Sequence, residues 1–423
     1  MASQFTHKRK LELLATAIRD NMPFVTASVQ KFPQSEMKGR KLGAMVHMYL
    51  ADPGKTYDGI IADPSEIYEV ELVAYMQSKG TSVETDIWED FNDIESFAKE
   101  VLKPRGLKLA RDIEKEVIDL NVFRGMQAVV RPKVGGVSAP DFELLTDAAT
   151  KLSELSVAGR LIDFQSPTIF GKISATGLGK FLPDDIMRDV YKQRYLGEYA
   201  GASNIQQALM PVIKMSSTMD TAPTNTFTKE TETVGGVTKI VGYTVGALTA
   251  SSGKTLENGA AYEVPGVFIV DESGAETNQP LVVIYHKAVS GANKGVLTFA
   301  NGIEGLRVTA KGEGYHNPNV WVDPTTFDSG SATTTVTCSA LLGAGKSYAV
   351  GQCRTEDALC FDSYSFSDLP SSRTENVGVD GPITLKCMAF GEGKSGVQLT
   401  RIDAPHLSTI WEPRRCVTTY VEV

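Results

Sequence analysis

Alternation of apolar and polar positions predicts a two-stranded arm near the start of the chain. Met45–Leu50 predicts one strand, and a Pro-Gly turn follows it. In Ile67–Met76 every second residue is apolar while Glu69 and Glu71 fall on the other side, which predicts a second strand with one wet face. Its apolar side consists of Val70, Leu72, Ala74 and Met76. Because an isolated hairpin is only marginally stable in water, we expect the arm to lie on its own subunit or on a neighbouring copy.

Helical periodicity predicts a long amphipathic helix over Gly106–Val129. One face is apolar, and charged residues cover the others. The apolar face consists of Leu109, Ile113, Val117 and Leu120. Similar spacing predicts further helices, at Asp93–Leu102, Phe142–Val157 and Pro183–Leu196, and an N-terminal amphipathic helix with Leu11, Leu14 and Ile18 on one face.

Between Pro223 and Gly345 the pattern changes to short strands in a stretch rich in Thr and Gly. Turn signals such as Gly-Gly, Ser-Gly and Asn-Gly separate apolar or alternating runs. The runs are Thr238–Leu248, Val264–Val270, Leu281–Tyr285, Gly295–Phe299, Val320–Val322 and Thr333–Leu341. Several short strands at this spacing predict a barrel or a sandwich.

Strands are predicted again in the tail, at Thr384–Phe390, Val397–Ile402 and Arg415–Val421. Helices therefore precede the strand-rich block, and more strands follow it. We interpret the block as a domain inserted into another domain, within an α+β chain.

Charge and cysteine usage narrow the range of functions. The formal net charge of −9 argues against a surface that holds nucleic acid tightly, because neutralising phosphates requires clustered Lys and Arg. No apolar run approaches the roughly 20 residues of a membrane-spanning helix. The five cysteines lack CxxC spacing, which favours reduced thiols packed as small apolar residues. We expect no zinc site, and a reducing compartment.

The strongest signal for an enzyme is the segment Gly343–Ser347, which resembles the end of a P-loop. A P-loop cradles phosphates with backbone N–H groups and must open a helix. Here Ala340 occupies the position of the first glycine, and the residues after Lys346 do not begin a helix. We interpret the glycines as a hinge where the inserted block rejoins the rest of the chain.

No other motif predicts a catalytic, cofactor-binding or metal site. Gly391, Gly393 and Gly396 match the dinucleotide-binding spacing, but strand residues follow them, which favours a hairpin turn. The five histidines are isolated, without a second ligand at i+4, and are predicted to be surface or core residues. We therefore expect a protein that is not an enzyme and carries no cofactor.

The order of elements resembles that of the major capsid (coat) proteins of tailed bacteriophages, with their Hong Kong 97-like fold. It is most similar to the P-twenty-two-type coat proteins, which carry an inserted β-barrel. The strand Tyr68–Met76 leading into Ile87–Phe91 resembles the end of the family's extended loop. Gly106–Val117 is similar to the spine helix, and Leu182–Val190 through Leu209–Ile213 resembles the axial domain before its insertion.

The resemblance implies a domain plan and a set of partners. The plan comprises an N-terminal arm, an extended β-hairpin loop, a peripheral domain with the spine helix, an axial domain and an inserted β-rich domain. The N-terminal arm would span 1–35 and the extended loop 36–78. The peripheral domain would comprise 79–135 with 380–423, the axial domain 136–222 with 346–379, and the inserted domain 223–345. The chain would assemble as hexamers and pentamers into an icosahedral virion head, in the bacterial host cytoplasm. Implied partners are a scaffolding protein, a portal and, as a further candidate, a decoration protein, around double-stranded DNA held without sequence-specific binding and without a membrane. Val70, Leu72 and the helix face would then serve assembly.

Two other classes of protein remain open. A P-loop-type nucleotide-binding enzyme would bind ATP measurably. A β-rich tail or surface binding protein would carry repeats, trimeric coiled-coil heptads or a secretion signal, and the sequence contains none of these.

Overall fold

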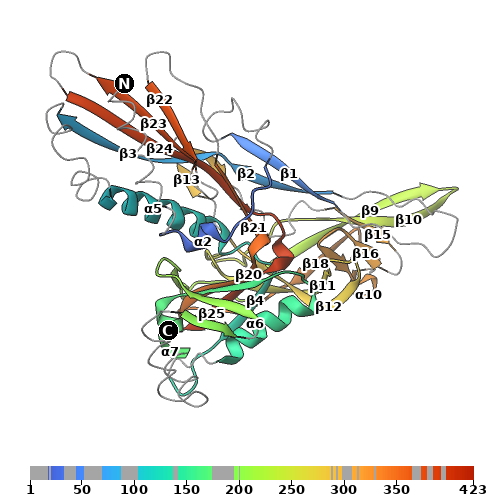
Figure 1. The fold of residues 1–423 in the computed structure, drawn as a ribbon. Helices are drawn as coiled ribbons and strands as arrows, with labels where there is room; N and C mark the ends of the chain where they lie inside the picture. The colour runs from blue at the N-terminus through green and yellow to red at the C-terminus, as the bar shows by residue number, and fades with distance from the viewer. Residues whose placement is uncertain are drawn as a thin grey trace.

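The computed structural model is a mixed helix-and-strand fold in which strands predominate (Figure 1). It describes residue 18 and residues 21–32, 44–51, 69–86, 103–136, 142–173, 195–199, 201–286, 289–291, 294–297, 307–311, 314–327, 330–363, 373–378, 384–391 and 397–423. The α+β expectation is therefore confirmed at this level. The predicted segments 87–91, 93–102 and 183–194 lie outside the described residues, as do Leu11 and Leu14.

The longest described helix, α5 (Lys103–Asn121), lies along one face of a five-stranded antiparallel sheet (Figure 1). The sheet has the order β21–β24–β23–β22, and β3 also pairs with β24. Its strands are β3 (Gln77–Asp86), β21 (Leu359–Ser363), β22 (Arg373–Gly378), β23 (Thr384–Gly391) and β24 (Val397–Ile410). The predicted apolar face is confirmed as the buried face, because Leu109, Ile113 and Val117 are at most 3% exposed.

Both ends of this helix differ from the prediction. The helix begins at Lys103 and includes Pro104, since proline is tolerated in a first turn, where its missing N–H has no intrahelical partner. It ends at Asn121, whose side-chain Nδ2 donates to the Val117 carbonyl at 2.9 Å. The residues that follow are apolar because they form a strand, β4 (Gln127–Arg131), and not because the helix continues.

A second, seven-stranded sheet has the order β4–β25–β20–β5–β7–β6, and β8 also pairs with β20. Its further strands are β5 (Leu161–Gln165), β6 (Tyr195–Tyr199), β7 (Ala202–Gln206), β8 (Val212–Lys214), β20 (Ser347–Thr355) and β25 (Cys416–Glu422). The helix α6 (Phe142–Glu154) buries its apolar face against Ala349, Cys353 and Val417 of this sheet. The short helix α7 (Pro167–Ile173) adds Ile169 and Ile173 to the same cluster.

One sequence expectation fails in this sheet. Tyr195 and Leu196 belong to strand β6 and not to the end of a helix. The domain plan with boundaries near residues 135 and 380 stays a prediction; β4 and β25 of its peripheral domain pair with each other, and β25 also pairs with β20 of its axial domain. The parallel pairing of β4 with β25 joins segments almost 300 residues apart, and no local pattern encodes such a contact.

The strand-rich block forms a sheet of its own with nine strands. The path runs β12–β11–β17–β16–β15–β10–β9–β18, and β19, which follows β18 directly, pairs back onto β11. The sheet thus returns on itself as a barrel does. Its strands are β9 (Thr224–Val234), β10 (Val237–Val245), β11 (Ala261–Val270), β12 (Glu276–Ile284), β15 (Arg307–Lys311), β16 (Gly314–His316), β17 (Val320–Val322), β18 (Thr333–Thr337) and β19 (Ser339–Ala340).

The predicted strands of this block are present, and three strands of its sheet were missed, the long β9 and the short β15 and β16. The interior is filled by aromatic rings, among them Phe227, Tyr243 and Phe327, which are fully buried. Strand β9 escaped prediction because Thr, Lys and Glu outnumber apolar residues along it. A separate hairpin of β13 (Val289–Gly291) and β14 (Lys294–Leu297) and the short helix α10 (Pro324–Phe327) complete the block.

The predicted arm is present as an antiparallel pair of β1 (Met45–Ala51) and β2 (Glu69–Tyr75). Val46 and Ala74 are opposite each other in its register, and both are buried. They join a small cluster with Phe32, Met76, Cys360 and Leu407. The base of the arm therefore rests on its own subunit, near β21 and β24.

Candidate functional site

The predicted assembly residues fall into two groups. Val70 and Leu72 lie in β2, opposite Leu50 and Met48 of β1, but their side chains are outside the described part of the structure. Leu109, Ile113, Val117 and Leu120 are all buried within the subunit. The apolar face of α5 is therefore part of the subunit's own core, and a role of these residues in assembly stays a prediction.

A buried carboxylate on the same helix was missed by the sequence pattern. Glu114 is 2% exposed, and its Oε1 accepts hydrogen bonds from the Phe24 backbone N–H at 2.7 Å and from Gln207 Nε2 at 2.9 Å. Desolvation by burial raises the pKa of Glu114 to about 7, against the lowering effect of these two hydrogen bonds. The one available signal was that Ala110 and Ile118, one turn to either side, are apolar.

A buried guanidinium also contacts Phe24, the residue whose N–H donates to Glu114. Arg354 of β20 is fully buried, and its Nη2 donates to the Phe24 carbonyl at 2.9 Å. Its guanidinium carbon lies 4.7 Å from the centre of the Phe24 ring and 5.2 Å from that of Phe164. Burial lowers the pKa of Arg354 to about 10, and the guanidinium remains charged near neutral pH.

The N-terminal segment 21–32 is thus fastened across the subunit by buried polar groups. It contains the short helix α2 (Pro23–Thr26), and further along Val29 exchanges backbone hydrogen bonds with the edge of β21. Asp362 Oδ2 accepts from the backbone N–H groups of Lys31 and Phe32, each at 3.0 Å. This N-terminal strap joins helix α5 to β20 and β21, two strands that belong to different sheets.

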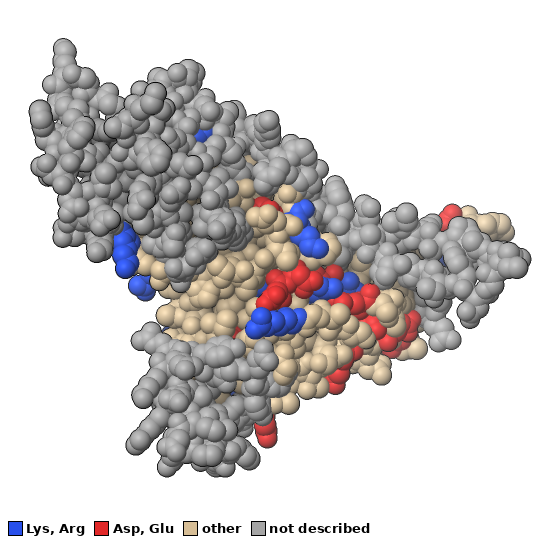
Figure 2. Space-filling model, in the orientation of Figure 1, with Lys and Arg blue, Asp and Glu red and all other residues tan. Residues whose placement is uncertain are grey.

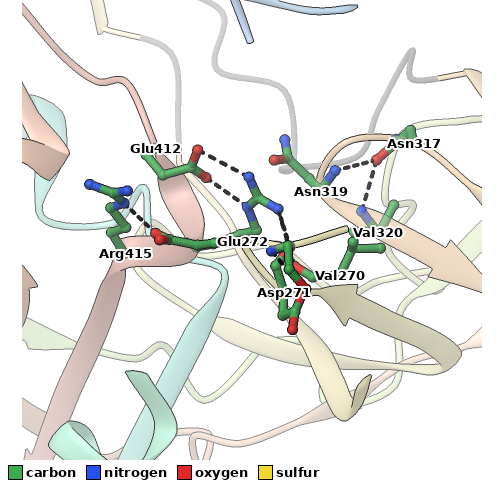
Figure 3. A network of polar contacts seen from close by, with 10 residues as sticks. Val270, Asp271, Glu272, Asn317, Asn319, Val320, Glu412 and Arg415 are labelled. Atoms are coloured by element: carbon green, nitrogen blue, oxygen red, sulfur yellow. Dashed lines mark hydrogen bonds and ion pairs between the residues drawn. The ribbon is translucent and has the colours of Figure 1, made fainter. Parts of the chain in front are cut away.

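A second polar cluster joins the strand-rich block to the rest of the subunit (Figure 3). Arg414 lies in η5 (Pro413–Arg415), a short 3-10 helix before β25, and forms a two-pronged ion pair with Glu412 at 2.8 and 3.1 Å. Its Nη1 donates to the carbonyls of Asp271 at 2.7 Å and Val270 at 3.3 Å, at the end of β11. Because both charged side chains are at most 5% exposed, removing either partner would leave an unpaired buried charge.

Neighbouring residues extend this junction. Arg415 pairs with Glu272 in the β11–β12 turn and with Asp357 in η4 (Glu356–Ala358), as drawn in part in Figure 3. The Asp271 carboxylate closes the same turn by accepting from the N–H groups of Ser273 and Ala275. The junction is therefore a polar anchor that fixes one end of the barrel against the C-terminal strand.

The P-loop-like segment lies where the strand-rich block rejoins the seven-stranded sheet. Ser347 begins strand β20 and no helix follows, as the sequence indicated. Lys346 Nζ is 3.0 Å from Glu422 Oε2, so its charge is balanced within the fold. Gly345 has a φ of +74°, a backbone conformation that L side chains rarely adopt, so the chain makes a tight turn here; a hinge at this turn stays a prediction. This geometry lacks the helix N-terminus that a P-loop requires.

The remaining motifs also have structural explanations. Gly391 pairs with Gln398 between antiparallel β23 and β24, which confirms the hairpin, although residues 392–396 lie outside the described part. His286, His316 and His406 are buried, as core histidines. Four cysteines, Cys338, Cys353, Cys360 and Cys416, are buried free thiols.

Neither a metal centre nor a membrane helix emerges from the described residues. Among them, no three His, Cys, Asp or Glu side chains are grouped so that they could hold a metal ion. None of the helices in the described ranges combines the length and apolarity needed to cross a membrane. On the face drawn in Figure 2, the described acidic and basic side chains lie in mixed clusters.

Comparison with known proteins gives matches in structure alone. No protein-family model and no curated protein matches the chain. Among solved structures, it is similar to the mature capsid of bacteriophage PhiM1, with 8% identity, a TM-score of 0.42, and 94% of this chain and 86% of that chain covered. It is also similar to the capsid of cyanophage P-SCSP1u, with 9% identity, a TM-score of 0.41, and coverage of 90% and 85%.

A virus-like particle from Pyrococcus furiosus is a third similar structure. Its match has 9% identity, a TM-score of 0.37, and coverage of 98% of this chain and 99% of that chain. All three TM-scores are below 0.5, and a likeness of this degree carries no conclusion about what the present chain does.

Proposed function

We propose that this chain is a major capsid protein that assembles as hexamers and pentamers into the icosahedral head of a tailed bacteriophage. In this proposal it has the Hong Kong 97-like fold with an inserted β-barrel of the P-twenty-two type, and its role is mechanical rather than catalytic. The proposal is based on the chain's own order of elements.

The observation that carries the proposal is the succession of a two-stranded arm, a long helix on a sheet, and a barrel set between adjacent strands. The arm β1–β2 runs into β3, which pairs with β24 above α5. This order is the one that the sequence resemblance implies for an extended loop leading into a spine helix. Val46 and Ala74, at the base of the arm, are buried on the subunit itself, and a hairpin that extends beyond such a base is stabilised when a neighbouring copy covers it.

The place of the strand-rich block supports its interpretation as an insertion. The chain leaves the seven-stranded sheet after Lys214 of β8 and returns at Ser347 of β20, and these two residues are partners in the same ladder. Backbone bonds continue between the departing and returning segments, from Met215 N–H to the Lys346 carbonyl at 2.8 Å and from Gly345 N–H to the Ser216 carbonyl at 3.0 Å. Ends this close together are what an inserted domain requires.

The partners proposed are further copies of the chain, a scaffolding protein and a portal, with a decoration protein as an additional candidate. A net charge of −9 suits a wall that must contain DNA without binding it, because phosphates are not attracted to an acidic surface. The proposed location is the virion, after assembly in the bacterial host cytoplasm.

Expression of the full chain, followed by negative-stain electron microscopy and light scattering, tests the proposal. We expect shells, polyheads or capsomers, alone or with the phage's scaffolding protein. A subunit that stays monomeric at all concentrations, with and without that scaffold, would refute the proposal. Calorimetry with ATP and magnesium on the same preparation tests the nucleotide-binding alternative, for which we expect no saturable heat.

A further inference from the structure

An outward face of the barrel, across β18, β9 and β10, is covered by threonines in a regular array. In β18, Thr333, Thr335 and Thr337 are exposed. They are directly opposite Thr228, Thr226 and Thr224 of β9, respectively. Every second pair of this ladder, three in all, is therefore threonine opposite threonine.

The alternation of burial shows that these threonines share one side of the sheet. In β9 the intervening residues Asn225 and Phe227 are fully buried, while Thr224 and Thr226 are half-buried and Thr228 is exposed. The barrel therefore keeps its aromatic core behind the sheet and presents threonines in front of it, since side chains alternate along a strand.

The array continues onto β10 and the segment after it. Thr244 is opposite Thr228 and is exposed, and Thr249 forms an isolated bridge with Thr224. Between them, Gly246 N–H donates to the Thr226 carbonyl, so the middle row ends on a glycine. Glu230 lies at the border of the face, and its Oε1 accepts from the Thr244 hydroxyl at 2.6 Å.

We propose that this threonine face packs against the same face of a second copy of the chain, across a two-fold axis. A two-fold contact places identical patches against each other, so the patch must complement itself. A threonine hydroxyl both donates and accepts hydrogen bonds, and its methyl group packs on another methyl group. Copies with a net charge of −9 repel one another overall, so an uncharged face is the surface on which they can approach closely.

The rigidity and size of the face indicate a weak contact that requires repetition. β-branched side chains have little χ1 freedom to lose on contact. Three strands and three rows span about 10 Å across and about 14 Å along the strands, which is far less than the roughly 800 Å² per partner of a standard interface. The inference therefore rests on the proposed function, because a shell repeats the contact many times and the repeats add up.

A charge substitution and its matched control test the contact. Thr226→Glu places like charges against each other at the centre of the face. Thr231→Glu makes the same change in the same strand, at an exposed position on the opposite side. We expect Thr226→Glu to raise the concentration at which particles appear about tenfold or more, and Thr231→Glu to leave it within about twofold. Equal thermal unfolding of the two unassembled variants shows that folding is not the cause.

Cross-linking identifies the occupant of the face directly. Single variants Thr226→Cys and Thr231→Cys, each with the native cysteines present, are treated with a short bismaleimide. We expect covalent dimers in Thr226→Cys particles alone, because facing sheets lie about 10 Å apart. Particles that form but show no excess of dimer for Thr226→Cys over Thr231→Cys would overturn the inference and leave the proposed function intact.

Two other outcomes are equally decisive. If Thr226→Glu impairs assembly without the Thr226→Cys dimer, the face meets a different surface or protein, and the self-pairing is refuted. If the wild-type chain forms no particles even with scaffold, the proposed function fails. Cross-linking of concentrated subunits then decides the face on its own, and a dimer specific to Thr226→Cys supports it.

Discussion

Replacing Glu114 by glutamine should remove a pH-dependent loss of stability. In the folded subunit the pKa of Glu114 is raised to about 7 by desolvation, against 4.5 for an exposed glutamate. The folded state therefore binds more protons than the unfolded state between about pH 4.5 and pH 7. The free energy of unfolding must fall as the pH rises through that window, because stability decreases wherever the folded state holds the extra proton.

The structure sets the size of this effect. The difference between a pKa of about 7 and one of 4.5 corresponds to about 3.5 kcal/mol, at about 1.4 kcal/mol for each pH unit. Glutamine retains an oxygen that can accept from the Phe24 N–H and carries no charge at any pH. We expect Glu114→Gln to match the wild type near pH 5 and to be more stable by about 2–3 kcal/mol near pH 8.

Urea unfolding of the unassembled subunit from pH 5 to pH 8, followed by circular dichroism and tryptophan fluorescence, measures the difference. Asp163, whose pKa burial also raises to about 7, contributes a similar slope to both proteins and cancels in the comparison. Glu143→Gln, at an exposed glutamate of α6, is the matched control. Its free energy of unfolding should differ from that of the wild type by the same amount at every pH. If the free energy of unfolding of Glu114→Gln falls with pH as steeply as that of the wild type, the argument that burial raises the pKa of Glu114 is refuted.

Three further predictions concern other parts of the chain. Ile113→Asp should abolish assembly or give insoluble protein, because Ile113 is fully buried and burying an unpaired carboxylate costs about several kcal/mol. Normal yields of normal particles would mean that the apolar face of α5 is misassigned. Lys346→Ala should change neither particle formation nor nucleotide binding, since its partner is Glu422, and ATP binding lost in the variant by calorimetry would revive the enzyme alternative. The fragment 223–345 should fold alone and give dispersed proton NMR signals, because its strands β9–β12 and β15–β19 form one sheet. A collapsed spectrum would mean that these strands depend on the rest of the subunit.

Local patterns in the sequence determined the elements that depend on local spacing. The apolar period of α5, the alternation in β2 and the Gly-rich turns of the barrel each reflect a residue-by-residue constraint on which side is buried. The sequence also argued against a P-loop, because the residues after Lys346 lack a helix start, and strand β20 begins there. These inferences hold because they do not depend on which distant segment of the chain packs against each element.

The tertiary structure alone decided which segments meet and which polar groups are buried. The apolar run after Asn121 forms a strand because β25, from the far end of the chain, offers it a parallel partner. Glu114 and Arg354 look like surface charges in the sequence, yet both are buried. Glu114 accepts a hydrogen bond from the Phe24 backbone N–H, and Arg354 donates one to the Phe24 carbonyl. The threonine face exists because β18 pairs with β9, more than 100 residues earlier in the chain. Burial and strand order arise from contacts between distant residues, and a local pattern does not contain them.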